Sequence, residues 1–302
     1  MLPKRLQRGD TIGVIAPSDP ITGEKQEELM QAKAILEKDG FQVKLSKHIF
    51  SNTLGYSATV EEKVADLHQM FADPEIKMVW CARGGENCNS LFDYLDFDFI
   101  RKNPKIFCGY SDITSLANVI YAKTGLVTFS GTNFKTIATD ETDYSYEEAK
   151  KRFVDGSLEL GQGEEYAVIK EGTAEGILVG GNLSLTRGLV TGNYTLDFQD
   201  KILFLEELSF ESGPALISNF LYYMKQNGVF DKIRGLWLGH YDNPIPLEKI
   251  VLDVLGDEIP FPIVKCNHFG HTEKKTVIPI GTRARIDTSK KEMVKLVEAC
   301  VE

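Results

Sequence analysis

The chain has 302 residues, of which 42% are hydrophobic and 26% are charged, a composition typical of a globular protein large enough for two domains. Its 34 basic residues are outnumbered by 44 acidic ones, and the net charge of −10 argues against a nucleic-acid partner. No apolar run approaches the roughly 20 residues that span a bilayer. The run from Ile12 to Ala16 is too short for a signal peptide and ends at Pro17, so we expect a cytoplasmic protein with no membrane partner.

The sequence also lacks the common motifs for metals and cofactors. Its five cysteines are an odd number and form no C-x-x-C pair, so a zinc site is not expected. Neither of the glycine-rich motifs for nucleotides, G-x-x-x-x-G-K-[ST] and G-x-G-x-x-G, occurs. Cys81, Cys108 and Cys266 lie in apolar runs, which indicates buried free thiols in a reducing compartment. We therefore expect no cofactor and no metal.

The N-terminal part alternates apolar strands with amphipathic helices. The predicted strands are 11–16, 41–45, 78–82, 106–108 and 127–129, and the predicted helices are 24–39, 59–71, a stretch through 91 and 95, and 113–124. Thr59 and Glu62 form a capping box, and Gly125 closes the last of these helices. Strands that are apolar throughout and alternate with helices predict a flavodoxin-like parallel sheet with helices on both faces.

The remaining chain divides into a polar segment and a second series of strands. We interpret 141–173 as a linker or loop with one helix near 146–153, because acidic residues and glycines interrupt the hydrophobic pattern. The expected domains are therefore 1–140 and 174–302. In the second domain the predicted strands are 176–179, 202–205, 235–239, 263–266 and several after 277, and the predicted helices are 183–190, 214–227 and 247–255.

The junction of the strand at 106–108 and the helix at 113–124 is a candidate for chemistry. Gly109-Tyr110-Ser111-Asp112 makes an abrupt turn between them, which would expose the Ser111 hydroxyl beside the free amides of the helix start. This is the logic of a nucleophile elbow, although Ile113 replaces the last glycine of G-x-S-x-G. The alternative is that Ser111 or Asp112 only caps the helix.

Other polar residues also follow apolar strands, where ligands of parallel sheets bind. Glu206 and Glu207 follow one such strand, and either could be a buried acid or a surface residue. His268 and His271 lie in a glycine-containing turn after another, and each could be structural. The glycine pair after Arg83 could offer amides to an oxyanion or form a tight turn, and Gly180-Gly181-Asn182 is equally ambiguous. Arg83 could bind a carboxylate or form an ordinary salt bridge.

The chain resembles the LD-carboxypeptidase family of serine peptidases, within it the branch of the microcin C self-immunity proteins. The matching segments include GDTIGVIAPSDP, RGGENCNSLFDYLDFDFI, NPKIFCGYSDIT, GILVGGNLS, KILFLEE and FGHT followed by IPIG. The resemblance implies a catalytic triad of Ser111, Glu206 and His271, with the backbone amides of Gly85 and Asp112 as the oxyanion hole. It also implies an N-terminal α/β domain, a smaller β-rich C-terminal domain, a site in the groove between them, and a homodimer.

The expected activity is hydrolysis of an amide bond in a small peptide, with an L,D bond of a murein-derived peptide as the leading substrate. We assign substrate contacts to Arg83, Gly84, Glu86 and Asn182. One alternative is hydrolysis of a toxic aminoacyl-nucleotide conjugate, as in the immunity branch. That branch uses a tryptophan-bearing loop, whereas Trp80 and Trp237 lie in predicted core strands. An alternative of another class is a two-domain protein that binds a small ligand without turnover.

Overall fold

The computed structural model describes residues 1–161 and 165–302, and over these residues it contains one sheet of six strands and one of seven. The six-stranded sheet has the order β11-β5-β4-β3-β1-β2. Its first five strands in the sequence are β1 (Thr11–Ile15), β2 (Gln42–Leu45), β3 (Ile76–Cys81), β4 (Ile106–Gly109) and β5 (Thr128–Ser130). These pair in parallel, and their order 2-1-3-4-5 is that of flavodoxin-like folds. The α/β fold predicted from the sequence is confirmed.

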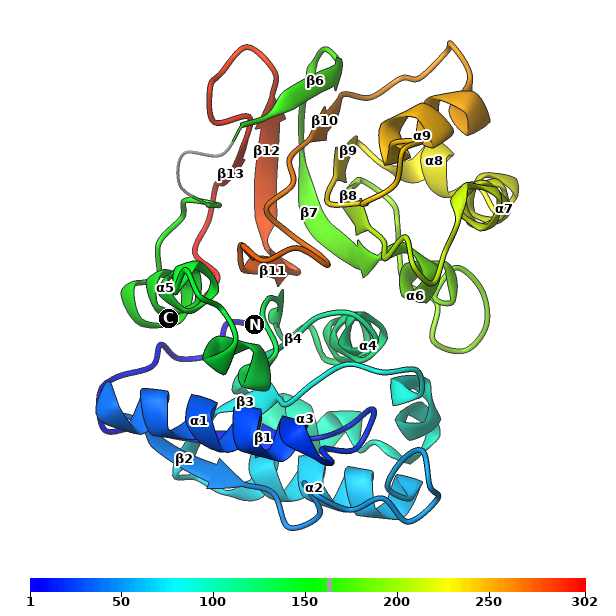
Figure 1. The fold of residues 1–302 in the computed structure, drawn as a ribbon. Coiled ribbons are helices and arrows are strands. Elements are labelled where there is room, and N and C mark those ends of the chain that lie inside the picture. Colours follow the sequence, from blue (N-terminus) through cyan, green and yellow to red (C-terminus); the bar gives the residue numbers. More distant parts are fainter. Residues whose placement is uncertain (162–164) are drawn as a thin grey trace.

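Helices follow the strands of this sheet in the predicted order (Figure 1). They are α1 (Glu24–Lys38), α2 (Val60–Ala72), the 3₁₀ helix η1 (Cys88–Tyr94), α3 (Phe97–Lys102) and α4 (Ile113–Thr124). The capping box predicted at Thr59 and Glu62 forms at the start of α2. Gly125 ends α4 in the left-handed conformation, with φ of 72°.

The second sheet has the order β13-β12-β7-β8-β9-β10-β6 and occupies the upper half of Figure 1. Its strands are β6 (Ala167–Lys170), β7 (Thr173–Asn182), β8 (Lys201–Glu206), β9 (Gly235–Leu238), β10 (Ile263–Lys265), β12 (Arg283–Asp287) and β13 (Val294–Leu296). β7 to β10 are parallel, and the other three strands pair antiparallel at its two ends. Its helices are α6 (Leu183–Arg187), α7 (Pro214–Gln226), α8 (Val229–Lys232) and α9 (Leu247–Leu255).

Two strands pair with a sheet outside the segment to which the sequence assigned them. The described part of the segment 141–173 contains α5 (Tyr144–Lys150) with a π-helical turn at Lys151–Asp155, and also β6, which joins the second sheet beside β10. β11 (Ile278–Ile280) comes from the C-terminal part but pairs antiparallel with β5 in the first sheet. The division into 1–140, 141–173 and 174–302 is a proposal about the sequence, and the two sheets exchange segments across it.

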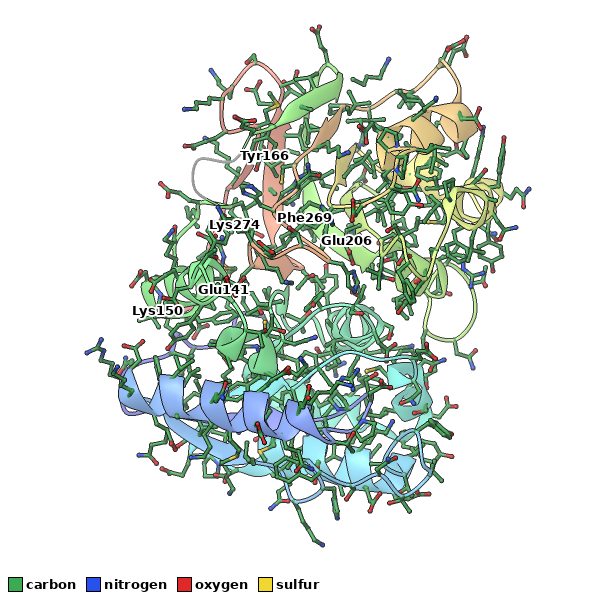
Figure 2. All side chains as sticks on the ribbon, viewed as in Figure 1. Glu141, Lys150, Tyr166, Glu206, Phe269 and Lys274 are labelled. Atoms are coloured by element: carbon green, nitrogen blue, oxygen red, sulfur yellow. The ribbon has the colours of Figure 1, made fainter. Side chains whose placement is uncertain are left out.

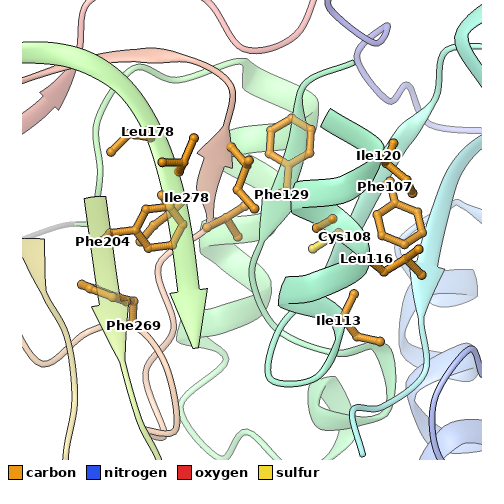
Figure 3. Packing of buried hydrophobic residues seen from close by; sticks show 14 of the residues in the cluster. Phe107, Cys108, Ile113, Leu116, Ile120, Phe129, Leu178, Phe204, Phe269 and Ile278 are labelled. Atoms are coloured by element: carbon orange, nitrogen blue, oxygen red, sulfur yellow. The ribbon is translucent and has the colours of Figure 1, made fainter. Parts of the chain in front are cut away.

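Helix α4 joins the two sheets. The side-chain amide of Asn118 donates to the Gly180 carbonyl at 2.8 Å and its oxygen accepts from the Gly180 amide at 3.2 Å. A Cβ on Gly181 would lie 2.8 Å from the side chain of Thr114, so glycine permits this approach of β7 to the helix. Figure 3 shows the surrounding core, with Leu116 on α4 and Leu178 on β7, both fully buried. The packing fixes the start of α4, and Ser111 with it, against the second sheet.

All five cysteines are buried and free, as predicted for three of them. Burial raises the pKa of the Cys81 and Cys88 thiols, which keeps them protonated. None of the helices in the described ranges is both long enough and apolar enough to cross a membrane.

Candidate active site

Ser111 lies on a strained turn between β4 and α4. Its φ is 65°, and among the described residues other than glycine only Asp143 and Asp200 also have a positive φ. A residue with a side chain adopts this conformation at a cost, which is typical of functional sites. Asp112 occupies the N-cap position of α4, but its side chain makes no capping hydrogen bond. The structure therefore has the strained geometry of an elbow rather than a side-chain cap at this turn.

His271 bridges Ser111 and Glu206. Its Nε2 lies 3.1 Å from the Ser111 Oγ, and its Nδ1 lies 2.8 Å from the Glu206 Oε2. A carboxylate only accepts hydrogen bonds, so Nδ1 carries the ring proton and Nε2 of the neutral ring accepts from the serine hydroxyl. The backbone amide of His271 also donates to Oε2, at 3.0 Å. Side chains from the turn after β4, from the end of β8 and from the loop after β10 thus form one hydrogen-bonded row, and Figure 2 shows Glu206 at the lower end of the second sheet.

Gly270 allows the close approach of Glu206 to His271. Its φ is 92°, and a Cβ placed on it would lie 2.3 Å from the Glu206 Oε2. Any side chain at this position would displace the carboxylate from the imidazole. The glycine before His271 is therefore required by the contact itself.

The surroundings of His271 change its pKa in opposite directions. Burial lowers the pKa, while the charge of Glu206, its hydrogen bond and the charge of Glu207 raise it, and the net result is a pKa above the usual value of 6.5. The edge of the Tyr110 ring packs on the imidazole with the ring centroids 5.2 Å apart. Burial, with a contribution from Glu206, raises the pKa of Tyr110 to about 12, so its hydroxyl stays protonated.

Glu207, the other candidate acid in the sequence, makes its hydrogen bonds away from His271. Its carboxylate accepts from the Asn182 side chain at 2.8 Å and from the backbone amides of Ser184 and Leu208, both at 2.9 Å. Burial and the neighbouring charge of Glu206 raise its pKa. Glu207 therefore holds the start of α6 against β8, whereas Glu206 contacts the imidazole.

The remaining predicted contact residues have different surroundings. Asn182 is buried, and its side-chain oxygen caps α6 by accepting from Ser184 and Leu185, so its polar atoms are all engaged within the protein. Arg83 forms an ion pair with Asp19 at 3.2 Å, the ordinary role that the sequence left open. The side chain of Glu86 is exposed. Asn182 is thus engaged within the protein, and the charge of Arg83 is paired with Asp19.

Two backbone amides close to Ser111 in the chain or next to Gly84 have no internal partner in the described structure. Within the described ranges, the amides of Gly85 and Asp112 donate no hydrogen bond. Gly84 allows the loop to approach, since a Cβ on it would lie 2.9 Å from the Cβ of Ser111. The Asp112 side chain accepts from Ser18 Oγ at 2.6 Å and from the Cys88 amide at 2.7 Å. This carboxylate ties the glycine loop to the serine turn, a function that the sequence did not reveal.

A cavity of about 930 Å³ opens beside His271. Its walls come from Tyr110, from 136–142 before α5, from the loop after β9 and from the loop around His271. The wall includes charged residues that sequence reasoning missed, because nothing in their local pattern marks them. They are Asp140, Glu141, Asp242, Glu273, Lys274 and Lys275.

A serine on a strained turn, joined through an imidazole to a buried carboxylate, is the arrangement of hydrolases with a serine nucleophile. Comparison with known families agrees with this class. Residues 12–131 match the LD-carboxypeptidase N-terminal domain, and residues 175–286 match the LD-carboxypeptidase C-terminal domain. The chain belongs to the LD-carboxypeptidase family and is a peptidase, not the non-catalytic binding protein considered as an alternative.

Individual relatives cover almost the whole chain. The probable murein peptide carboxypeptidase of Bacillus subtilis is 37% identical over 97% of this chain and 93% of its own length. The structure of MccF in complex with glutamyl sulfamoyl guanosine has a TM-score of 0.91 and 26% identity, covering 100% of this chain and 99% of that one. Muramoyltetrapeptide carboxypeptidase from Oxalobacter formigenes has a TM-score of 0.79 and 25% identity, covering 95% and 97%.

Proposed function

We propose that this peptidase hydrolyses an amide bond with Ser111 as nucleophile, His271 as general base and Glu206 as the acid that orients the imidazole. The observation that carries the proposal is the hydrogen-bonded row, with 3.1 Å from Ser111 to His271 and 2.8 Å from His271 to Glu206. Both distances lie within the range for proton transfer between a nucleophile and its base.

The reaction follows from these positions. His271 Nε2 takes the proton of Ser111 as its oxygen attacks the substrate carbonyl. Glu206 stabilises the imidazolium that forms, and His271 then gives its proton to the leaving amine. Water, activated by the same imidazole, attacks the acyl-serine ester and releases the second product.

The amides of Gly85 and Asp112 are the proposed oxyanion hole. Both are without an internal acceptor in the described chain and lie on the two segments that meet at Ser111. Each such donor typically contributes about 3 kcal/mol to stabilising the tetrahedral intermediate. The Asp112 side chain, by accepting from Ser18 and from the Cys88 amide, ties the serine turn to the end of the glycine loop and so helps to organise the site before substrate binds.

A murein-derived peptide cleaved at an L,D bond is the proposed substrate. Support comes from the names of the relatives in Bacillus subtilis and Oxalobacter formigenes, which act on murein peptides. The homodimer and the cytoplasmic location suggested by the sequence belong to the same proposal. The proposed substrate-contacting positions are Arg83, Gly84 and Glu86 on the loop after β3 and Asn182 at the end of β7, with Gly84 next to the serine.

A second candidate is hydrolysis of an aminoacyl-nucleotide conjugate. It is favoured by the likeness to MccF, whose structure holds glutamyl sulfamoyl guanosine. Trp80 and Trp237 are only 1% and 0% exposed, so neither can stack on a nucleobase at the surface. The immunity branch uses a tryptophan on a loop for this contact, and the burial of both tryptophans in this chain therefore favours the peptide substrate.

One assay separates the two candidates. The protein is incubated with a murein tetrapeptide and, separately, with a glutamyl nucleotide conjugate that has a hydrolysable amide bond, and the products are identified by mass. We expect loss of the terminal D-amino acid from the tetrapeptide at a kcat/KM at least tenfold above that for the conjugate. Faster release of glutamate from the conjugate would instead support the second candidate.

The pH dependence of turnover tests the role of His271. A general base must be neutral in the free enzyme, and the pKa of His271 is raised above 6.5 by the neighbouring carboxylates. We therefore expect kcat/KM to rise with pH and to reach its plateau only above neutrality. A profile with its acidic midpoint below 6.5, or no acidic midpoint at all, would contradict the assignment.

A further inference from the structure

Lys275 is a buried cation in the wall of the cavity beside His271. The residue is 5% exposed and lines the cavity together with Tyr110 and His271. Its ammonium donates to the Thr272 carbonyl and lies 5.1 Å from the centroid of the Tyr110 ring. In the part of the chain that the structure describes, no carboxylate lies within ion-pair distance of this ammonium.

A buried ammonium without a counter-ion is costly, and nearby acidic residues compensate only at longer range. Burial lowers the pKa of Lys275, while the charges of Asp140, Glu206 and Glu273 act in the opposite direction. Asp140 accepts from the Ser145 amide at 2.8 Å and from Thr142, and Glu206 contacts His271. Asp140 and Glu206 are therefore engaged elsewhere, and the side chain of Glu273 is exposed, which leaves the cation available to an anion in the cavity.

The backbone holds Lys275 in this position. Its amide donates to the Ser145 Oγ at 3.2 Å, and the same hydroxyl donates to the Glu273 carbonyl at 3.1 Å. This pair of bonds ties the loop after His271 to α5. The neighbouring Lys274 has an exposed side chain, and its ammonium lies 5.9 Å from the centroid of the Tyr144 ring instead. Of these two consecutive lysines, only Lys275 is fixed beside Tyr110.

The position of Lys275 fits the leaving side of the scissile bond. The Tyr110 ring contacts both the ammonium, at 5.1 Å, and the imidazole, at 5.2 Å between centroids. His271 must protonate the leaving amine, so the departing residue lies next to the imidazole. In a C-terminal residue the carboxylate is within one residue length of that amine, roughly 3.5 Å. A terminal carboxylate would then enter the part of the cavity that Lys275 borders.

We propose that Lys275 binds the terminal carboxylate of the peptide substrate and so restricts the enzyme to the last peptide bond. The inference rests on the proposed function and names the group that recognises the chain end. It assigns this role to Lys275 in place of Arg83, whose guanidinium is paired with Asp19. A charge-assisted hydrogen bond to a buried carboxylate is strong enough to set such a preference.

Two substrates that differ only at the chain end test the inference. One is a tetrapeptide with a free terminal carboxylate, and the other is the same peptide ending in a primary amide. For Lys275→Met we expect kcat/KM on the free acid to fall about 10- to 100-fold, and kcat/KM on the amide to change less than about threefold. Lys275→Arg should restore part of the loss. Lys249→Met, which removes an exposed lysine of α9 outside the cavity wall, is the control and should leave the ratio between the two substrates unchanged.

The outcomes separate this inference from the proposed function. If Ser111→Ala abolishes hydrolysis of both peptides but Lys275→Met leaves their ratio unchanged, Lys275 does not read the carboxylate and the nucleophile stands. If the wild-type protein hydrolyses neither peptide, the proposed function and this inference fail together. If Lys275→Met does not fold, the test uses the wild type alone, by comparing its kcat/KM on the free acid with that on the amide. A preference for the free acid below about threefold overturns the inference.

Discussion

Replacing Ser111 with alanine should reduce turnover by about 10⁵-fold and leave the fold intact. Alanine has the same Cβ as serine, so the approach of Gly84 to the turn does not change. What disappears is the hydroxyl that His271 contacts at 3.1 Å and, with it, the acyl-enzyme route. Only the residual effect of binding and of the oxyanion hole remains.

The measurement is kcat on the tetrapeptide, with circular dichroism and thermal unfolding to verify the fold. Ser90→Ala is a suitable control, because the Ser90 hydroxyl donates to the Asn87 carbonyl and lies outside the hydrogen-bonded row. That variant should keep wild-type turnover within a few-fold. If Ser111→Ala retained more than about 1% of wild-type kcat, another nucleophile would be at work.

Replacing Glu206 with glutamine should lower kcat by about 10³- to 10⁴-fold. The amide can no longer act as a pure acceptor for His271 Nδ1, so the ring loses the tautomer that leaves Nε2 free to take the serine proton. The charge that raises the pKa of His271 is also removed. The acidic midpoint of whatever activity remains should therefore move to lower pH, which the pH profile of kcat/KM measures directly.

Glu207→Gln is the matched comparison and should behave differently. It weakens the contacts to Asn182 and to two backbone amides, so we expect a loss of about 1–3 kcal/mol in the free energy of unfolding. Its kcat should stay within about tenfold of the wild type, because its carboxylate makes no hydrogen bond to the imidazole in the described structure. The reverse pattern, a folded but inactive Glu207→Gln and an active Glu206→Gln, would exchange the two roles.

Much of the fold could be predicted because its signals are local. Apolar strands, the capping box at Thr59 and the closing glycine at 125 act over a few residues, and the corresponding elements lie where expected. The position of β11 beside β5 could not be found this way. Its three residues gain their partner from a strand about half the chain away, and pairing of that range leaves no trace in the local pattern.

β6 was missed for a related reason. Its four residues are exposed or half-buried, and the strand lies at the edge of the second sheet. An edge strand buries little apolar surface. The apolar run of β6, Ala167 to Ile169, is short and lies among acidic residues and glycines, so the local pattern favours a loop. The polar composition of 141–173 is therefore that of an edge strand and short helices as much as that of a linker.

Part of the candidate site could be predicted from the sequence, because its residues lie next to strands that have a local apolar signal. Ser111, Glu206 and His271 each follow an apolar strand, and the fold places such positions near one another. Periodicity could not choose between Glu206 and Glu207, because successive residues of a strand point to opposite faces and the pattern does not say which face holds the imidazole. The family resemblance pointed to Glu206, and in the structure the carboxylate of Glu206 contacts the imidazole. Lys275 has no signal at all, since its burial and its contact with Tyr110 arise only from tertiary packing.

Covalent labelling of the nucleophile tests the central claim most directly. A fluorophosphonate reagent is reacted with the wild type and with His271→Ala, and the adduct is located by intact mass and peptide mapping. We predict one adduct per chain on Ser111 in the wild type, and labelling slower by at least about 10³-fold without the imidazole. An adduct on a different residue, or rapid labelling of Ser111 in the absence of His271, would contradict the account.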